Sequence, residues 1–283
     1  MTMQYQLPRR PADGHKGTFG RVAIIAGSPG MSGAACLAGK AALRSGAGLV
    51  TVAVPESIQP IVAAFEPSYM TVALSCGDDG RLATDVAAGV LELLAIQDAV
   101  AIGPGLTQKD AARELVRALI SHVNVPLILD ADALNSVAAD KLSLTRSAPT
   151  IVTPHPGEFA RLTGLSPEEI HTNRQSLSTE FARKTETIVV LKGAGTVVTN
   201  GIQTYVNSTG NSGMATGGSG DVLTGVITAL CGQHLNPYEA AVAGVHAHGL
   251  AGDLYAEERS ARGMIASDLL ESLPFAWGRL DTD

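Results

Sequence analysis

The sequence predicts one α/β domain with a mainly parallel central sheet and helices on both of its faces. Three observations support this fold class. Val- and Ile-rich runs alternate with helical segments along the whole chain. The apolar runs lack polar alternation, as in strands buried on both faces. Hydrophobic residues make up 45% of the 283 residues and charged residues 17%, which is enough to bury a large core. No linker or low-complexity stretch interrupts the pattern, so we expect a single domain over residues 1–283.

The strands are predicted from short apolar runs that end at glycine or at polar residues. RVAIIAG at 21–27 is such a run, closed by a glycine. The run at 126–135 ends in acidic residues. The strand segments, in order, are 21–27, 49–54, 99–103, 126–135, the start of 150–164, and a set of strands joined at glycines within 187–207.

The helices are predicted from alanine-rich or amphipathic segments. Residues 32–48 are rich in alanine, have Ser32 as a candidate cap and end in glycines. Residues 110–122 place apolar side chains on one face. The remaining predicted helices are 86–95, the end of 150–164, 173–184, 221–232, 236–258 and 265–272.

Composition excludes several classes of partner. The net charge is −7 and no basic block occurs, so we expect neither a nucleic acid nor a membrane surface as partner. The first residues contain no apolar stretch of signal-peptide length, and no window has the length of a membrane span. The three cysteines are far apart and form no CxxC pair, which favours reduced thiols in a cytoplasmic protein.

Five chemically rich turns follow predicted strands: AGSPG, GPGL, LDADALN, TPHPGE and LKGAG. In open α/β sheets, ligands bind beyond the carboxyl ends of the strands. We therefore expect these turns to converge on one site.

The stretch NSGMATGGSGDVLTG at 211–225 carries the strongest signal. Glycines directly before a helix let an anion approach backbone N–H groups at the positive end of the helix dipole, and we expect such an anion hole at Gly217, Gly218, Ser219 and Gly220. No Lys-Ser/Thr pair follows, so this is not a Walker A loop. A carboxylate such as Asp221 repels a phosphate, so a loop that only binds phosphate would not carry one. Its presence is explained if Asp221 takes a proton from a hydroxyl that attacks the phosphoryl group. The alternative is that Asp221 is an ordinary N-cap and the glycines form a turn.

Two other turns have a functional and a purely structural interpretation. LKGAGTVV places Lys192 and backbone N–H groups where a nucleotide could bind, or it is a β-hairpin with a glycine turn. In TPHPGE, His155 could contact substrate and Glu158 could order Mg²⁺ through water, whereas the helix dipole alone would also favour Glu158.

The remaining candidates are less specific. Asp130 and Asp132 end a strand, where they could meet a metal or a hydroxyl, or cap a helix. His246 and His248 are two apart and do not share a helix face, so we interpret them as structural. Lys16 in GHKGTFG belongs either to a lid over phosphate or to a flexible terminus.

Taken together, these segments resemble the ADP/ATP-dependent NAD(P)H-hydrate dehydratases of the ribokinase-like superfamily. GHKGTFG, AGSPGMSGAA, ALRSGAGLVT, GPGL, DADALN, TPHPGEFARL, LKGAGTVV and GNSGMATGGSGDVLTG resemble that family's segments in its order, from about residue 14 to 275. The resemblance implies a ribokinase-like fold and a metabolite-repair lyase. A nucleotide would phosphorylate the C6 hydroxyl of hydrated NADH or NADPH, and elimination of phosphate would restore the cofactor.

The resemblance also implies roles for particular residues. Asp221 would be the catalytic base. Ala42, Gly105, His155 and Asp221 would bind the hydrated dinucleotide. Lys192, Gly193, Ala194, Gly195, Thr196 and Gly220 would bind the adenine nucleotide. Mg²⁺ is implied by phosphoryl transfer, with Glu158 as a ligand through water.

Further expectations concern partners and specificity. Bacterial-type members of the family are associated with ADP, so we expect ADP as donor with ATP as the alternative, and a homotetramer. With about twenty residues before the first strand, we expect no epimerase domain, activity on the (S) epimer alone, and a separate NAD(P)H-hydrate epimerase upstream. Many ribokinase-like kinases have Asn-x-x-Glu where this chain has His155-Pro-Gly-Glu158. The alternatives are a small-molecule alcohol kinase of the same superfamily and a non-catalytic nucleotide-binding protein.

Overall fold

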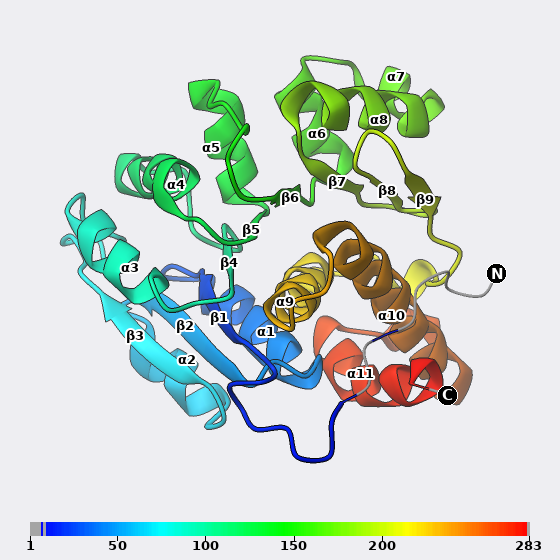
Figure 1. Cartoon of the computed structure of the whole chain (residues 1–283), viewed down its shortest axis with the longest axis horizontal. Helices are drawn as coiled ribbons and strands as arrows, with labels where there is room; N and C mark the ends of the chain where they lie inside the picture. The colour runs from blue at the N-terminus through cyan, green and yellow to red at the C-terminus, as the bar shows by residue number, and fades with distance from the viewer. Residues whose placement is uncertain (1–6, 8–9, 282–283) are drawn as a thin grey trace.

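The protein is built around one nine-stranded sheet (Figure 1). The computed structural model describes residue 7 and residues 10–281. The strand order is β3-β2-β1-β4-β5-β6-β7-β8-β9. The strands are β1 (Arg21–Ile25), β2 (Leu49–Pro55), β3 (Met70–Leu74), β4 (Ala99–Ile102), β5 (Leu127–Leu129), β6 (Thr150–Val152), β7 (Ile188–Leu191), β8 (Val197–Thr199) and β9 (Thr204–Val206).

Strands β1 to β7 run parallel, and β8 and β9 add an antiparallel edge. In the centre, Val22 of β1 lies opposite Val50 of β2 on one side and Ala99 of β4 on the other. The predicted mainly parallel sheet is confirmed. The antiparallel edge follows from the short KGAGT turn, which is long enough for a hairpin but not for a crossover.

Helices cover both faces of the sheet. Alternate residues of β1 belong to two separate apolar clusters: Val22 and Ile24 to one, Ala23 and Ile25 to the other. The first cluster includes side chains from α1 (Ser32–Arg44), α2 (Gln59–Phe65), α9 (Ser219–Gly232), α10 (Pro237–Glu258) and α11 (Ala266–Leu280). The second includes side chains from α3 (Val86–Leu94), α4 (Asp110–His122), α5 (Asp132–Asp140), α6 (Pro156–Thr163), α7 (Pro167–Thr172) and α8 (Arg174–Thr185).

Several local predictions need correction. Helices α2 and α7 and strand β3 were not predicted, because these two helices are short and β3 is a partly exposed edge strand, and the start of α5 lies in the 126–135 segment, which was predicted as a strand. The 126–135 segment is a three-residue strand followed by α5, with Ala131 between them at a φ of 48°. Ser32 is the first residue of α1 and not its cap, which is Met31. In the part of the chain that the structure describes, no helix is long and apolar enough to cross a membrane.

Candidate active site

A cavity of about 910 Å³ lies beyond the carboxyl ends of β5, β6 and β7. Its walls are the turn after β7, the 207–216 segment that leads into α9, the first turn of α9, and part of α10. The sequence-predicted residues that line it are Asp130, His155, Glu158, Lys192, Gly193, Ala194, Gly195, Thr196, Ser219, Gly220 and Asp221. The sheet topology thus brings the LDADALN, TPHPGE and LKGAG turns together with GGSGD, as expected, whereas the AGSPG and GPGL turns do not line this cavity.

Asp221 lies in the first turn of α9 and is not its cap. The helix begins at Ser219 and its N-cap is Gly218, whose φ of 91° favours glycine. The N-cap interpretation of Asp221 is therefore wrong. Burial, together with the nearby Asp130 carboxylate, raises the pKa of Asp221 to about 7, although Lys192 opposes the shift. A carboxylate with that pKa is suited to accept a proton near neutral pH.

Lys192 follows β7 and turns its ammonium into the site. Its Nζ donates to Oδ1 of Asp130 at 2.6 Å and lies 3.9 Å from Oε2 of Glu158. Burial acts to lower the pKa of Lys192, but the two carboxylates outweigh it and the pKa is raised. The ammonium therefore stays charged beside the cavity.

Asp130 is a fully engaged buried carboxylate. It is 1% exposed and also accepts hydrogen bonds from Thr153 Oγ1 and Thr224 Oγ1, each at 2.8 Å. Both carboxylate oxygens of Asp130 accept hydrogen bonds from protein side chains. The prediction that Asp130 binds a metal directly therefore has no support in this geometry. Asp132 is the first residue of α5 and accepts the Thr107 N–H at 2.8 Å, so its role is in the loop and helix start.

His155 and Glu158 form a capping box at the start of α6. The His155 Nδ1 accepts the N–H groups of Gly157 and Glu158 at 2.9 and 3.4 Å, and Glu158 Oε2 accepts the His155 N–H at 2.8 Å. The structural interpretation of Glu158 is thus correct, and both side chains also line the cavity. Burial and the Lys192 charge lower the pKa of His155, and burial raises the pKa of Glu158. His155 is therefore a neutral ring with its proton on Nε2.

The KGAGT turn is both a hairpin and a wall of the cavity. β7 and β8 pair antiparallel on either side of it, and Gly193 and Gly195 take φ values of 140° and 64°. Arg174 lies behind the turn and donates to the carbonyls of Leu191 and Lys192 at 2.8 and 3.1 Å. The hairpin interpretation is confirmed, and it leaves the exposed turn available to a nucleotide.

Some predicted residues lie elsewhere. Ala42 is fully buried in α1. Gly105 follows β4 at a φ of 62°, and neither it nor Ala42 lines the cavity. Gly217 and Gly218 precede the lining residues of α9 without belonging to them.

The GHKGTFG segment does not cover the site. Lys16 is exposed, and its backbone carbonyl lies against Gly48. Gly20 lies against Gly232, the last residue of α9. α9 is roughly 20 Å long, and the cavity is at its other end. The interpretation of this segment as a phosphate lid is not supported.

Sequence reasoning missed two parts of the site. His248 lines the cavity, with Nε2 3.4 Å from Ser219 Oγ, and burial lowers its pKa to about 4, so the structural interpretation of His248 is incomplete. The same interpretation is correct for His246, which hydrogen-bonds Tyr205. The 207–216 segment is held by Asp253, which accepts the Gly210 N–H at 2.7 Å. The run of small polar residues and glycines in NSTGNSG, at 207–213, was the sequence feature that could have predicted this part of the cavity wall.

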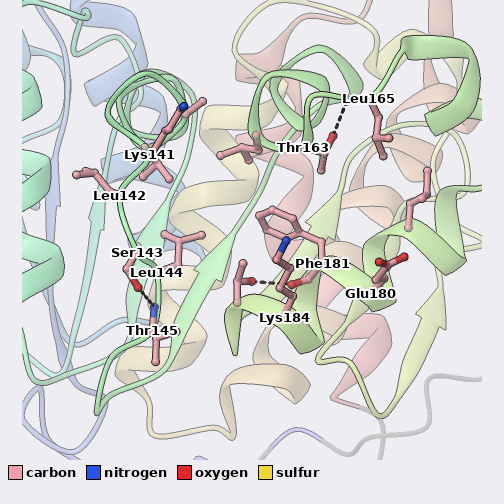
Figure 2. A pocket seen from close by; sticks show the side chains of 15 residues that line it. Lys141, Leu142, Ser143, Leu144, Thr145, Thr163, Leu165, Glu180, Phe181 and Lys184 are labelled. Carbon is pink, nitrogen blue, oxygen red and sulfur yellow. Dashed lines mark hydrogen bonds between the residues drawn. The ribbon is translucent and has the colours of Figure 1, made fainter.

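A second cavity, of about 480 Å³, lies between α5, α6 and α8 (Figure 2). Its apolar lining residues include Leu142, Leu144, Leu165 and Phe181. It opens near the last turns of these helices, away from the carboxyl ends of the strands. Its charged side chains, Lys141, Glu180 and Lys184, form no cluster like that around Lys192.

Two kinds of comparison bear on this geometry. A family model described as NAD(P)H-hydrate dehydratase matches residues 22–275. The chain belongs to this family. It is 37% identical to the ADP-dependent (S)-NAD(P)H-hydrate dehydratase of Bacillus subtilis, over 97% of this chain and 95% of that protein. It is 48% identical to the bifunctional NAD(P)H-hydrate repair enzyme of Moorella thermoacetica, over 98% of this chain but 53% of that protein. The chain thus spans about half the length of such bifunctional relatives.

Solved structures agree with the family assignment. The ADP/ATP-dependent NAD(P)H-hydrate dehydratase from Bacillus subtilis, co-crystallized with ATP/Mg²⁺, superposes with a TM-score of 0.86 at 36% identity, covering 97% of this chain and 95% of that chain. A ribokinase-like superfamily protein from Enterococcus faecalis superposes with a TM-score of 0.83 at 28% identity, covering 96% and 91%. The predicted ribokinase-like fold is confirmed. A hydroxyethylthiazole kinase from Pyrococcus horikoshii has a TM-score of 0.61 at 17% identity, over 92% of this chain and 89% of that chain, and shares the fold.

Proposed function

We propose that this chain is an ADP-dependent (S)-NAD(P)H-hydrate dehydratase that also accepts ATP. The observation that carries the proposal is Asp221, a partly buried carboxylate in the cavity wall with a pKa of about 7, in the first turn of α9. Binding alone gains nothing from a carboxylate at a phosphate site, whereas a hydroxyl that attacks phosphorus needs a base. Membership of the dehydratase family supports this reading over an alcohol kinase.

The proposed reaction has two steps. The C6 hydroxyl oxygen of the hydrated nicotinamide attacks the terminal phosphorus of the nucleotide, its proton passes to Asp221, and the bond from phosphorus to the leaving nucleotide oxygen breaks. The C6–O bond then breaks with loss of a proton from the neighbouring C5, which yields inorganic phosphate and the restored double bond. Phosphate leaves readily where water does not, so the nucleotide supplies the driving force for dehydration.

The cavity supports a division of the proposed binding roles. Lys192, Gly193, Ala194, Gly195, Thr196 and Gly220 would hold the nucleotide. The N–H groups of Ser219 and Gly220 in the cavity wall, with those of Gly217 and Gly218 just outside it, would form the anion hole for its phosphates. His155 and Asp221 would meet the hydrated nicotinamide. Gly105 lies outside the cavity wall, so a dinucleotide would have to extend toward it along the same sheet edge. Ala42 offers no exposed side-chain surface to a ligand.

Mg²⁺ fits this site as an ion carried by the nucleotide. Among the described residues, no group of three or more metal-ligating side chains comes together. Glu158 would hold the ion through water, and Mg²⁺ commonly binds with several waters and substrate phosphates. When bound, it would neutralise phosphate charge. An upstream epimerase, a homotetrameric assembly and a cytoplasmic location complete the proposal, and the family resemblance alone supports them.

The test is the reduced-nicotinamide absorbance on mixing the protein with hydrated NADH, Mg²⁺ and either ADP or ATP. We expect absorbance to rise together with release of inorganic phosphate, and the faster donor identifies the physiological class of nucleotide. A stable phosphorylated product without NADH would instead establish an alcohol kinase. No reaction from folded protein that binds nucleotide would overturn the proposal.

A further inference from the structure

The ammonium of Lys192 is held in a fixed place at the entrance to α9. Its Nζ donates to Asp130 at 2.6 Å, and a Cβ added to Gly220 would lie 3.2 Å from the same Nζ. Gly220 is the second residue of α9 and Asp221 the third. The backbone of Lys192 belongs to the nucleotide turn, but its charge lies beside the helix N-terminus, at the cavity wall.

A buried anchor fixes this position. Asp130 accepts hydrogen bonds from Thr153 Oγ1 on one oxygen and from Thr224 Oγ1 on the other, both at 2.8 Å. Thr153 and Thr224 are fully buried; Thr153 directly follows β6, and Thr224 lies in the second turn of α9. The carboxylate therefore cannot rotate without breaking a buried hydrogen bond, which is costly. The rigid carboxylate in turn confines the Lys192 ammonium.

The ammonium retains donors for a ligand. An ammonium has three N–H donors. Within the described part of the chain, Asp130 is at hydrogen-bond distance and Glu158, at 3.9 Å, is not. Because Gly220 has no side chain, this position of α9 leaves room beside Nζ, where an added Cβ would lie only 3.2 Å away.

We propose that the Lys192 ammonium binds the transferred phosphoryl group, and that Asp130, fixed by Thr153 and Thr224, is the residue that positions it. This inference rests on the proposed phosphoryl transfer and adds to it. In that transfer the oxygen–phosphorus bond to the substrate forms, the bond to the leaving nucleotide breaks, and the hydroxyl proton goes to Asp221. Lys192 keeps its protons throughout and stabilises the charge spread over the phosphoryl oxygens.

The positioning role of Asp130 is tested with a matched pair of threonine variants. Thr224→Val removes one hydrogen bond to Asp130. Thr228→Val changes an equally buried threonine one turn further along α9, whose hydroxyl donates to the Thr224 carbonyl and does not touch Asp130. We expect Thr224→Val to lower kcat about fivefold with KM for both substrates within about twofold. Thr228→Val should lower thermal stability comparably and leave kcat unchanged.

The role of the ammonium is tested by binding, without turnover. Lys192→Met alone leaves Asp130 buried without its partner and can unfold the protein, so the double variant Asp130→Asn/Lys192→Met removes both charges together. Affinities for AMP, ADP and ATP are measured by calorimetry in Mg²⁺. We expect about a tenfold loss of affinity for ADP and for ATP, which carry a transferable phosphoryl group, and an unchanged affinity for AMP, which carries none.

The outcomes separate this inference from the proposed function. Equal kcat in the two threonine variants, or an equal loss of affinity for all three nucleotides, would overturn it while an active wild type keeps the dehydratase proposal. A wild-type protein that makes no NADH would overturn the dehydratase proposal. The AMP, ADP and ATP affinities would still show whether the Lys192 ammonium binds the terminal phosphate.

Discussion

The N-terminal and C-terminal parts of α9 are both rich in glycine, but for different reasons. A Cβ on Gly217, just before the helix, would meet nothing within 4 Å, and one on Gly220 would meet only the Lys192 side chain. Further along, a Cβ on Gly225 would collide with the Ala38 carbonyl, and one on Gly232 with the Val22 side chain. The later glycines let neighbouring elements approach closely, as does Gly218, where an added Cβ would meet Leu37 at 2.5 Å, whereas Gly217 and Gly220 leave space that no other element fills. A glycine-rich motif therefore indicates a ligand only where protein does not already fill the space.

The largest effect on activity should come from a substitution at Asp221, in the first turn of α9 beside the cavity. Asp221→Asn keeps the size of the side chain and removes its ability to accept a proton. We expect kcat to fall about 10³-fold, within the range for loss of a general base, with nucleotide affinity nearly unchanged. Steady-state kinetics and calorimetry on the same preparation check this. A variant that keeps most of its rate would contradict the assignment of the base.

A substitution at Gly225, where α9 packs closely against α1, should lower the stability of the protein. Gly225→Ala places a methyl group against Ala38 and Ala41 of α1, and we expect the free energy of unfolding to fall by about 2 kcal/mol. Gly89→Ala on the exposed face of α3 is the matched control, since a Cβ there meets nothing within 4 Å and should stabilise by about 0.5–1 kcal/mol. Urea unfolding measures both. Equal effects of the two substitutions would remove the distinction between filled and open glycines.

The pH dependence of activity should follow Asp221. Its carboxyl must be ionised to accept a proton, so kcat/KM should rise with pH up to about 7 and fall about tenfold per unit below it. Because the folded-state pKa is raised above the ordinary value, the contribution of this group to stability falls as pH rises between the two values. Asp221→Asn should lack that slope. An activity profile that is flat between pH 5 and pH 8 would refute the role of a carboxylate with this pKa.

Gly220→Ala should separate activity from stability. The new methyl group would press only on the Lys192 ammonium, at 3.2 Å, at the end of a flexible side chain. We expect the folded protein to keep its stability or gain slightly, because alanine favours a helix. The displaced ammonium should reduce kcat about fivefold. Loss of stability without loss of rate would show that the site does not use this space.

The smallest effect is expected at Gly217. Gly217→Ala should change the free energy of unfolding by less than about 0.5 kcal/mol, since the methyl group meets no protein atom. If an anion occupies the space beside this backbone, affinity for ADP should fall about threefold. Unchanged ADP affinity, measured by calorimetry, would assign that space to solvent.

Local patterns were sufficient where the interactions are local. Residues 110–122 were predicted as a helix and form α4, because one face carries the buried side chains of Leu115 and Leu119. The convergence of three strand-end motifs was also predictable, since parallel strands present their carboxyl ends at one edge. The β3 strand was not, because its exposed edge position gives it a mixed pattern.

The contacts that complete the site join residues far apart in the sequence. Lys192 and Asp130 are 62 positions apart, and His248 lies 29 positions from Ser219. No local periodicity reports such pairs. Ala42 is the opposite case. The family resemblance implies that it binds the dinucleotide, but α1 packs against α9 and Ala42 has no exposed surface.

The placement of α9 also sets the order in which the protein can be completed during synthesis. Val22 and Ile24, on the first strand, share an apolar cluster with Val222 and Val226 of α9. Ribosomes add about 5–20 residues per second, so the strand emerges on the order of ten seconds or longer before the helix that covers it. During that interval α1 and α2 already pack on this face of the sheet, while the part of the aliphatic surface that α9 later covers stays exposed to other chains.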